Sequence, residues 1–163
     1  MTEIHEQIDM WLKAFSYKVQ TEDRKVSKFL QRYPNIRHSL IVQIPSSQMR
    51  FRVIFDHHLE SFNFQMEMEF TKEDKKSFLN LKPSLRQKFF AGIKKVVYPF
   101  GLNLIIKKEN IGIIIVKTFF VENLNRQYFF DSLFSFIHAL ELIAIVYTDF
   151  SSSLTPINPT DMT

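Results

Sequence analysis

The nine residues FNFQMEMEF, at positions 62–70, alternate between apolar and polar side chains from end to end. Successive side chains of a β-strand point to opposite faces, so this period of two predicts a strand with one face in a core and the other in water. A one-residue slip in pairing would turn every apolar side chain of this strand to water. The stretch therefore predicts a strand and also the register of the strands beside it.

Two segments before it repeat the pattern, HSLIVQI at 38–44 and MRFRVIF at 49–55. Their connections, PSSQ at 45–48 and HHLE at 57–60, are short enough for hairpins. Keeping all apolar side chains on one face then selects one register and predicts a three-stranded antiparallel meander. The predicted opposing pairs are Leu40 with Val53, Val42 with Phe51, Ile44 with Met49, Val53 with Phe64, Phe55 with Phe62, Phe51 with Met66, and Arg50 with Glu67.

Helical periodicity flanks the meander on both sides. Apolar residues at spacings of three and four predict a first helix over 2–19, N-capped by Thr2, and a short apolar stripe that ends at Pro34. Thr71 and the acid three residues later form the capping signature of a further helix. Pro83 interrupts that helix and suits the first turn of the next one.

A second hairpin and a long helix complete the chain. LNLIIKK at 102–108 and GIIIVKTFFV at 112–121 predict two strands that are apolar on both faces. The last helix is expected to begin at 123–125 and to run to about Tyr147. It is expected to lie in a protein core and not in a membrane, because Asp131, His138 and Glu141 interrupt its apolar run.

These elements predict an α+β fold with the order α-β-β-β-α-β-β-α. The economical arrangement is a five-stranded, mostly antiparallel sheet with the helices packed on one face. Residues 1–150 are expected to form a single domain, and residues 151–163 a disordered C-terminal tail.

Composition excludes several classes of function. The chain of 163 residues has no cysteine, which excludes disulfides, cysteine zinc sites, iron–sulfur clusters and thiol catalysis. With three glycines, it contains neither a GxGxxG nor a GxxxxGK[ST] motif for nucleotide phosphates. No cofactor is therefore expected. The N-terminal residues lack the pattern of a secretory signal, so we expect a cytoplasmic protein.

The stretch Asp56-His57-His58-Leu59-Glu60 gathers histidines and carboxylates, the ligands of zinc and other transition metals. The predicted register places His38 at the same end of the sheet. Adjacent side chains of a strand diverge, however, and no HExxH motif is present, so a plain hairpin turn is favoured over a metal site. A metal-dependent enzyme at His38, His57 and His58 is the remote alternative.

The second hairpin is more informative because helices on one side of the sheet can cover only one of its two apolar faces. Ile105, Ile114, Val116 and Phe120 share the other face. Soluble monomers rarely expose large apolar patches, so either another helix of the same chain or a second chain is expected to cover these residues. A homodimer through this face of the sheet is the preferred prediction.

Basic residues supply a further alternative. The net charge is +4, and Lys94, Lys95, Lys107 and Lys108 fall near one end of a predicted helix and near the following turn. Such a patch would bind nucleic-acid phosphates. Cations at the end of a helix are also favoured by the helix dipole without any ligand, so nucleic acid is not the preferred partner.

The pattern resembles a known fold through IDMWL at 8–12, HSLIVQIP leading into RFRVIF, FQMEMEF before the helix at Thr71, and RQKFFAGI at 86–93. It is similar to the type III secretion chaperone-like fold, to YbjN-type domains and to an archaeal family of uncharacterised single-domain proteins. This resemblance implies a dimeric or partner-binding module without catalytic residues. Chaperones of that fold are typically acidic, whereas this chain is basic, which argues against binding of secretion effectors.

We therefore expect a soluble, non-enzymatic protein-interaction module that forms homodimers. A chaperone-like or adaptor-like role with an unknown protein partner fits both the apolar surface and the lack of any catalytic motif.

Overall fold

The computed structural model describes residues 3–45, 47–107 and 112–154. The helices are α1 (Ile4–Ala14), α2 (Lys28–Arg32), α3 (Lys72–Leu79), α4 (Pro83–Val97) and α5 (Arg126–Leu154), with short 3₁₀ turns at Tyr98–Phe100 and Val121–Asn123. The strands are β1 (Lys18–Thr21), β2 (Ile36–Gln43), β3 (Arg50–Asp56), β4 (Ser61–Glu69), β5 (Asn103–Lys107) and β6 (Gly112–Phe120).

The strands form one sheet in the order β1-β2-β3-β4-β6-β5, and each neighbouring pair is antiparallel. The α+β class is confirmed, but the predicted number of five strands is wrong, because the sheet has six. The extra strand is β1, whose Val19 pairs with Val42 of β2. In the sequence, Val19 had been assigned to the first helix.

Local backbone geometry explains why α1 stops early. Ser16 adopts a left-handed conformation with φ of 63°. Its N–H donates to the carbonyl of Lys13, and the N–H of Tyr17 donates to the carbonyl of Leu12 at 3.1 Å. This pair of bonds is the Schellman motif that ends helices, here with serine in place of the usual glycine. The chain then turns back and pairs as β1. The expected N-cap Thr2 lies outside the described residues.

The predicted register of the meander is confirmed where the strand pairs are recorded. Val42 faces Phe51 and Leu40 faces Val53 across β2 and β3, and Phe55 faces Phe62 across β3 and β4. On its other side, β4 pairs with β6 over its whole length. The strand with the cleanest alternation therefore lies inside the sheet and is bonded on both edges.

The predicted helix boundaries in the second half are mostly correct. Thr71 caps α3 by accepting the N–H of Asp74 at 3.1 Å, and Pro83 is the first residue of α4. α5 extends further than expected, because it ends at Leu154. Residues 151–154 are therefore helical and not part of a tail, while 155–163 lie outside the described residues.

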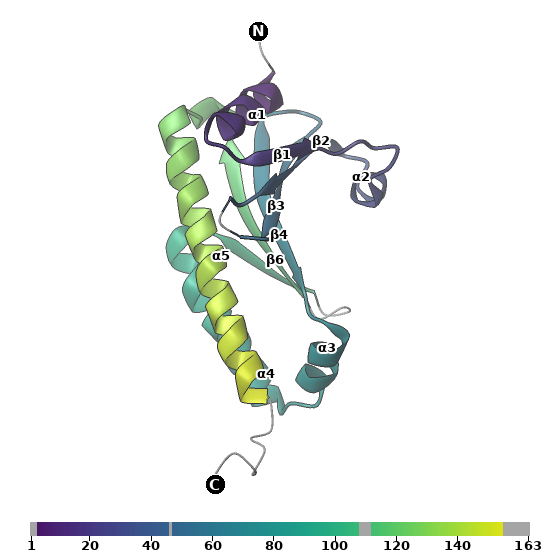
Figure 1. Ribbon diagram of the computed structural model, residues 1–163, viewed down its shortest axis with the longest axis vertical. Helices are drawn as coiled ribbons and strands as arrows, with labels where there is room; N and C mark the ends of the chain where they lie inside the picture. The colour runs from purple at the N-terminus through teal and green to yellow at the C-terminus, as the bar shows by residue number, and fades with distance from the viewer. Residues whose placement is uncertain (1–2, 46, 108–111, 155–163) are drawn as a thin grey trace.

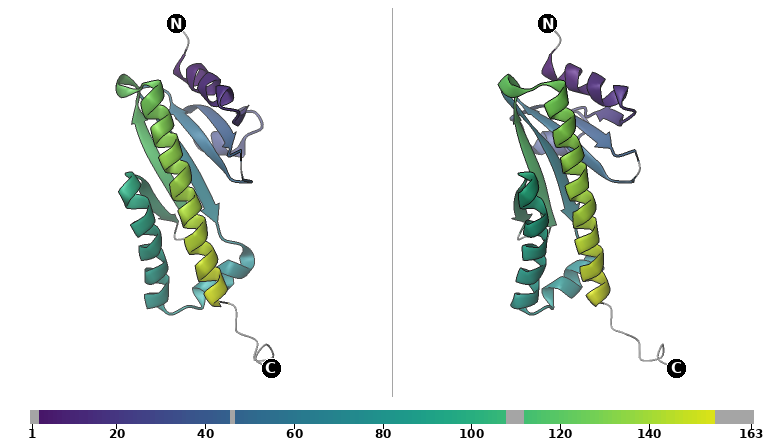
Figure 2. Two further views of the ribbon diagram at one scale, coloured as in Figure 1. Left: turned by 60° about the vertical axis from the view of Figure 1, so that its left-hand side comes forward. Right: turned by 90° about the vertical axis from the view of Figure 1, so that its left-hand side faces the viewer.

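The helices form layers on the sheet. α4 and α5 run side by side along one face, and α1 packs beside the N-terminal end of α5 (Figures 1 and 2). α2 lies on the opposite side of the sheet (Figure 1). The expectation that all helices cover one face is therefore wrong for α2, whose Phe29 ring lies 4.3 Å from the guanidinium of Arg52 on β3.

The main core is aromatic and centres on β4. Phe64 is fully buried and makes ring contacts with side chains from both neighbouring strands and from α5. Its partners are Phe51, Phe62, Phe119, Phe129 and Phe136, with ring centroids 4.6 to 6.1 Å away. Such pairs contribute about 0.5–1.5 kcal/mol each beyond the burial of apolar area.

A second aromatic cluster lies beyond the end of the sheet, where α3, α4 and the C-terminal part of α5 meet. Phe78, Phe89 and Phe150 contact one another there. Tyr147 of α5 donates a hydrogen bond to Asp74 of α3, and burial together with that carboxylate raises the pKa of Tyr147 to about 12. This cluster explains why the second half of α5 is apolar around most of its circumference.

By length and composition α5 is apolar enough to cross a membrane, with a mean hydropathy of 1.8 over an 18-residue stretch. One side of the helix nevertheless packs within the protein. Phe129, Leu133, Phe136, Leu140 and Ile143 are all buried. Much of the apolar character of α5 thus follows from its packing against the sheet and against α4 beside it.

Replacing Phe64 by alanine should lower the free energy of unfolding by about 3–5 kcal/mol, because the cavity would open at the centre of the aromatic core. Phe134→Ala on α5 is the matched control, since the Phe134 side chain is 51% exposed. That control should change the free energy by less than about 1 kcal/mol. Urea denaturation followed by circular dichroism measures both, and equal losses would contradict a core centred on β4.

Candidate functional site

One part of the sheet is left uncovered by the described helices. We call it the open face: the side of β4, β6 and β5 that points away from α5 (Figure 1). Ile105 and Ile114 lie opposite each other on this face, next to Val116. Ile105 is 52% exposed, and the other two are half-buried. The structure thus places these three predicted residues together on one exposed apolar surface.

The fourth predicted residue stands apart on the same face. Phe120 is 59% exposed. Thr118 separates it from Val116 along β6 and donates a hydrogen bond to Asn63 of β4 at 2.7 Å. Phe120 instead lines a shallow hollow with Leu59 at the end of the sheet. The open face therefore carries one apolar cluster and one isolated ring.

An ion pair borders the cluster and accounts for one of the predicted phosphate-binding lysines. Lys107 of β5 reaches across β6 to the carboxylate of Glu67 on β4. Gly112 is the β6 residue opposite Lys107, and it has no side chain to block that path. A Cβ at Gly112 would come within 3.0 Å of the Met68 carbonyl oxygen, so glycine is also the residue that fits there best. Lys107 is thus engaged within the chain.

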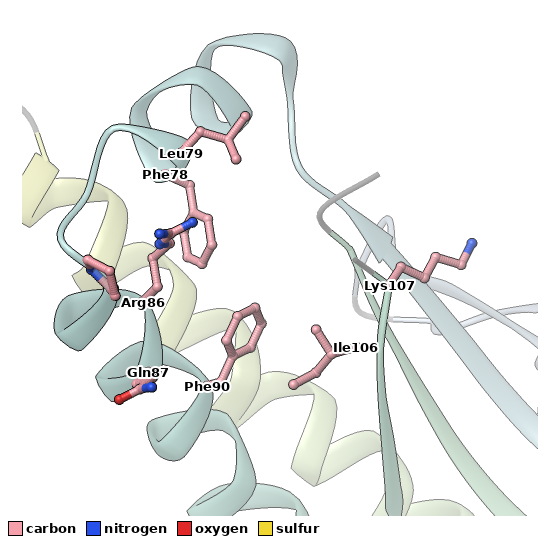
Figure 3. Close-up of a pocket in the computed structure, with 8 residues that line it drawn as sticks. Phe78, Leu79, Arg86, Gln87, Phe90, Ile106 and Lys107 are labelled. Atoms are coloured by element: carbon pink, nitrogen blue, oxygen red, sulfur yellow. The ribbon is translucent and has the colours of Figure 1, made fainter. Parts of the chain in front are cut away.

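The other lysines of the predicted patch lie on α4 or outside the described residues. Lys107 lies beside a pocket of about 390 Å³ between α3, α4 and β5, which is also lined by Phe90 and Arg86 (Figure 3). Lys94 and Lys95 are exposed about two helical turns beyond Arg86, or roughly 12 Å along the helix axis. Lys108 lies outside the described residues.

The β2–β3 part of the same sheet side is closed by a buried carboxylate that the sequence did not predict. The Glu22 side chain is 8% exposed. It accepts hydrogen bonds from Ser39 at 2.5 Å, Arg52 at 3.0 Å and Ser27 at 2.9 Å. Burial alone would raise the pKa of Glu22, but the bonds from these partners outweigh it and hold the pKa below its usual value. Arg52 pairs with Gln65 and therefore lies diagonal to Glu67 in the sheet, while its guanidinium binds Glu22.

Hydrogen bonds to Asp56 hold the turn that contains His57 and His58. The carboxylate of Asp56 accepts the N–H of Leu59 at 2.8 Å and the hydroxyl of Ser61 at 3.2 Å. Leu59 adopts a left-handed φ of 54°, which closes the four-residue connection. Nε2 of His57 lies 2.9 Å from the carbonyl oxygen of Pro34. The predicted turn is therefore present, and hydrogen bonds within the chain account for its shape.

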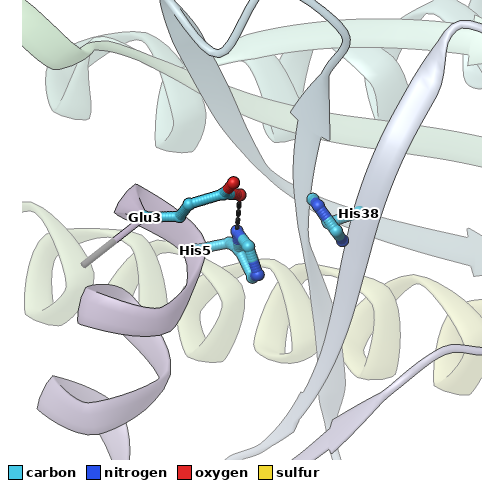
Figure 4. A group of neighbouring side chains, drawn as sticks. All are labelled: Glu3, His5 and His38. Carbon is cyan, nitrogen blue, oxygen red and sulfur yellow. Dashed lines mark ion pairs between the residues drawn. The ribbon is translucent and has the colours of Figure 1, made fainter. Parts of the chain in front are cut away.

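His38 lies elsewhere than the metal hypothesis required. It faces Phe55 as predicted, but its ring stacks on His5 of α1 with centroids 3.8 Å apart (Figure 4). Burial, with His5 and Arg37 nearby, lowers the pKa of His38. Among the residues that the structure describes, the group able to hold a metal that includes His38 consists of Glu3, His5 and His38, without His57 or His58.

Comparison with known proteins agrees with this architecture. The model of a family described as "Uncharacterized conserved protein (DUF2299)" matches residues 4–146. No protein in the search of curated proteins matches the chain.

Two solved structures are similar to the chain. A crystal structure of an uncharacterized protein from Methanothermobacter thermautotrophicus has a TM-score of 0.70 and 14% identity, covering 90% of this chain and 98% of that one. YbjN from E. coli has a TM-score of 0.45 and 11% identity, covering 91% and 92%. The first of these structures, with its TM-score of 0.70, shows a likeness of fold to an uncharacterized archaeal protein, as the sequence resemblance predicted.

Replacing Glu22 by glutamine should lower the free energy of unfolding by about 1–2 kcal/mol at neutral pH, because the bonds to Arg52 and both serines lose their charged acceptor. The folded-state pKa of Glu22 is lowered, so its stabilisation is present above the usual pKa of 4.5 and is lost as the pH falls through the folded value. The difference in the free energy of unfolding between wild type and Glu22→Gln should therefore be smaller at about pH 3 than at neutral pH.

Chemical denaturation at both pH values tests this expectation. Glu60→Gln is the matched control, because Glu60 is exposed and its side chain makes no hydrogen bond or ion pair with the described residues. A loss for Glu22→Gln that is the same at both pH values would show that the charge of Glu22 is not what stabilises the network.

Proposed function

The chain belongs to the DUF2299 family, and we propose that it is a protein-interaction module that forms a homodimer through the open face of its sheet. One observation carries the proposal. Ile105, Ile114 and Val116 form an apolar cluster on a sheet face that no described helix covers. Burying such a cluster against another protein removes apolar area from water, which is the main favourable contribution to association.

The chemistry of this sheet side favours a second copy as the partner. Outside the apolar cluster it carries a cation, Arg50, and a carboxylate, Glu69, both exposed and both without an ion pair among the described residues. In a two-fold interface each patch meets its own copy, so opposite charges on one surface can pair across the axis.

The position of β5 adds a second reason. β5 is the last strand of the sheet, so the backbone of one of its edges is not paired within the described chain. Unpaired strand edges tend to bind other strands. Ile105 is the middle residue of β5. Because Ile105 is exposed beside this edge, a second copy packed on the open face would cover it together with Ile114 and Val116.

This role needs no catalytic residue. Neither the matching family model nor the two similar structures is described as an enzyme. We therefore propose a non-enzymatic module whose dimer presents a surface to a further protein, in a chaperone-like or adaptor-like role.

A second candidate function rests on the charge of α4. The sequence of α4, PSLRQKFFAGIKKVV, contains four cations and no acid. Lys94 and Lys95 are exposed, and neither forms an ion pair with a described residue. This helix is the surface proposed for nucleic-acid binding. It holds Lys94 and Lys95 of the four predicted lysines, whereas Lys107 pairs with Glu67.

Replacing Ile105 by glutamate should raise the dimer dissociation constant about a hundredfold, because the interface would bury an unpaired charge at a cost of about 3 kcal/mol. Val116→Glu should act in the same direction. The mass of each protein is measured by sedimentation velocity or by light scattering after size-exclusion chromatography.

Ile145→Glu on α5 is the matched control, because Ile145 is an isoleucine of similar exposure, 56% against 52%, on another surface. It should leave the dimer intact. A wild-type monomer at micromolar concentration, or dissociation by all three substitutions alike, would refute an interface on the open face.

Nucleic-acid binding through α4 requires a steep dependence on salt. If four cations contact phosphates, raising the salt concentration from 50 to 200 mM should weaken the affinity about a hundredfold. The double variant Lys94→Gln, Lys95→Gln should reduce the slope of log affinity against log salt concentration by about 2. Fluorescence anisotropy with a labelled oligonucleotide measures both. The absence of binding at low salt would eliminate this candidate.

A further inference from the structure

We propose that Glu3, His5 and His38 form a binding site for a single transition-metal ion of the Zn²⁺ class. The three side chains come from two elements that are distant in sequence: Glu3 and His5 from the start of α1, and His38 from β2 (Figure 4). One ligand atom from each lies within 4.8 Å of the others. This site is separate from the open face and goes beyond the proposed interaction role.

The polar atoms of the cluster are the first observation that points to a ligand. Nδ1 of His5 and Nε2 of His38 are buried, and neither has a hydrogen-bond partner among the described residues. Nδ1 of His5 lies 3.3 Å from Oε2 of Glu3, an electrostatic contact without the alignment of a hydrogen bond. Buried polar nitrogens without partners are uncommon in folded proteins, and a bound cation would satisfy both.

The donor set is the second observation. Two imidazole nitrogens and one carboxylate oxygen suit zinc, and more generally the divalent ions from cobalt to zinc, better than calcium or magnesium. Three protein ligands leave the fourth position of a tetrahedral ion to water. The carboxylate of Glu3, at the N-cap of α1, also supplies negative charge that favours a divalent cation.

Two contacts define what must change when the ion binds. The imidazole rings are nearly parallel, with an interplanar angle of 17°, so one ring must turn before both nitrogens point at one ion. Arg37 also contacts the Glu3 carboxylate, with Nη2 at 3.2 Å from Oε1 and 3.4 Å from Oε2. Binding of the ion therefore disrupts the stacking of the two imidazole rings. The ion either shares the Glu3 carboxylate with the Arg37 guanidinium or displaces the guanidinium.

The structural consequence of binding is a clamp between α1 and the sheet. α1 covers one end of the core through Ile8 and Leu12, which are fully buried. Ligands on both α1 and β2 would hold this helix to the strand at its first turn. Because a ligand that binds only the folded state stabilises it, the melting temperature should rise with the free metal concentration.

The five histidines of the chain provide an internal control. Untagged protein stripped with a chelator is titrated with Zn²⁺ and followed by long-range ¹H–¹⁵N spectra of the imidazole rings. We expect saturation at one equivalent, with signals of His5 and His38 shifted and those of His57, His58 and His138 unchanged. Shifts confined to the other three histidines, or no saturable change, would overturn the site.

Variants measured by isothermal titration calorimetry separate ligation from a structural role. Glu3→Gln is informative because the Glu3 side chain is 47% exposed and its replacement leaves the core intact. We expect this variant and His38→Gln to weaken Zn²⁺ binding about tenfold or more. His57→Gln is the matched control and should bind as wild type. Unchanged affinity in both Glu3→Gln and His38→Gln would refute the proposal.

Discussion

Phe62 and Phe64 project from one face of β4 into aromatic side chains supplied by both neighbouring strands and by α5. Phe62 stacks on Phe119 of β6 with the rings 4.7 Å apart and almost parallel, and it faces Phe55 of β3 on its other side. Because β4 is bonded along both edges, a shift of this strand would break the contacts of two hairpins at once. The packing of α5 on the same rings makes the position of the last helix depend on the register of the sheet.

The sequence predicted the strand register of the meander correctly but missed β1. The meander was predicted because a period of two and two four-residue connections leave a single register that buries Phe55, Phe62 and Phe64 together. β1 was missed because the apolar spacing of α1 continues past Ser16, where a left-handed residue ends the helix without the glycine that usually signals it.

The candidate sites were harder to predict, since they combine residues far apart in the chain. Glu22 meets Ser39 and Arg52, 17 and 30 positions away, and no local pattern marks a carboxylate that will be buried by such partners. His38 was correctly placed opposite Phe55, yet its neighbour His5 depends on how α1 packs on the sheet. The predicted apolar face of the second hairpin followed from strand alternation, which is why its three central residues do lie together.

The side of the sheet opposite α5 is covered over some strands and exposed over others. Over β2 and β3, α2 and the network of Glu22 close it within the chain. Over β6 and β5, apolar side chains remain at the surface beside the ion pair of Lys107 and Glu67. The first half is held by hydrogen bonds to the Glu22 carboxylate, whereas the second half leaves apolar area exposed to solvent.

Because α5 follows all six strands in the sequence, it is synthesised after the sheet that it covers. Every strand leaves the ribosome before the helix that covers it, since α5 begins at Arg126 and ends the described chain at Leu154. Bacterial and eukaryotic ribosomes add about 5–20 residues per second. For the seconds needed to make α5, the phenylalanines of β3, β4 and β6 have no partner from the last helix. The aromatic rings that α5 covers in the folded chain therefore remain without this cover until the helix has been made.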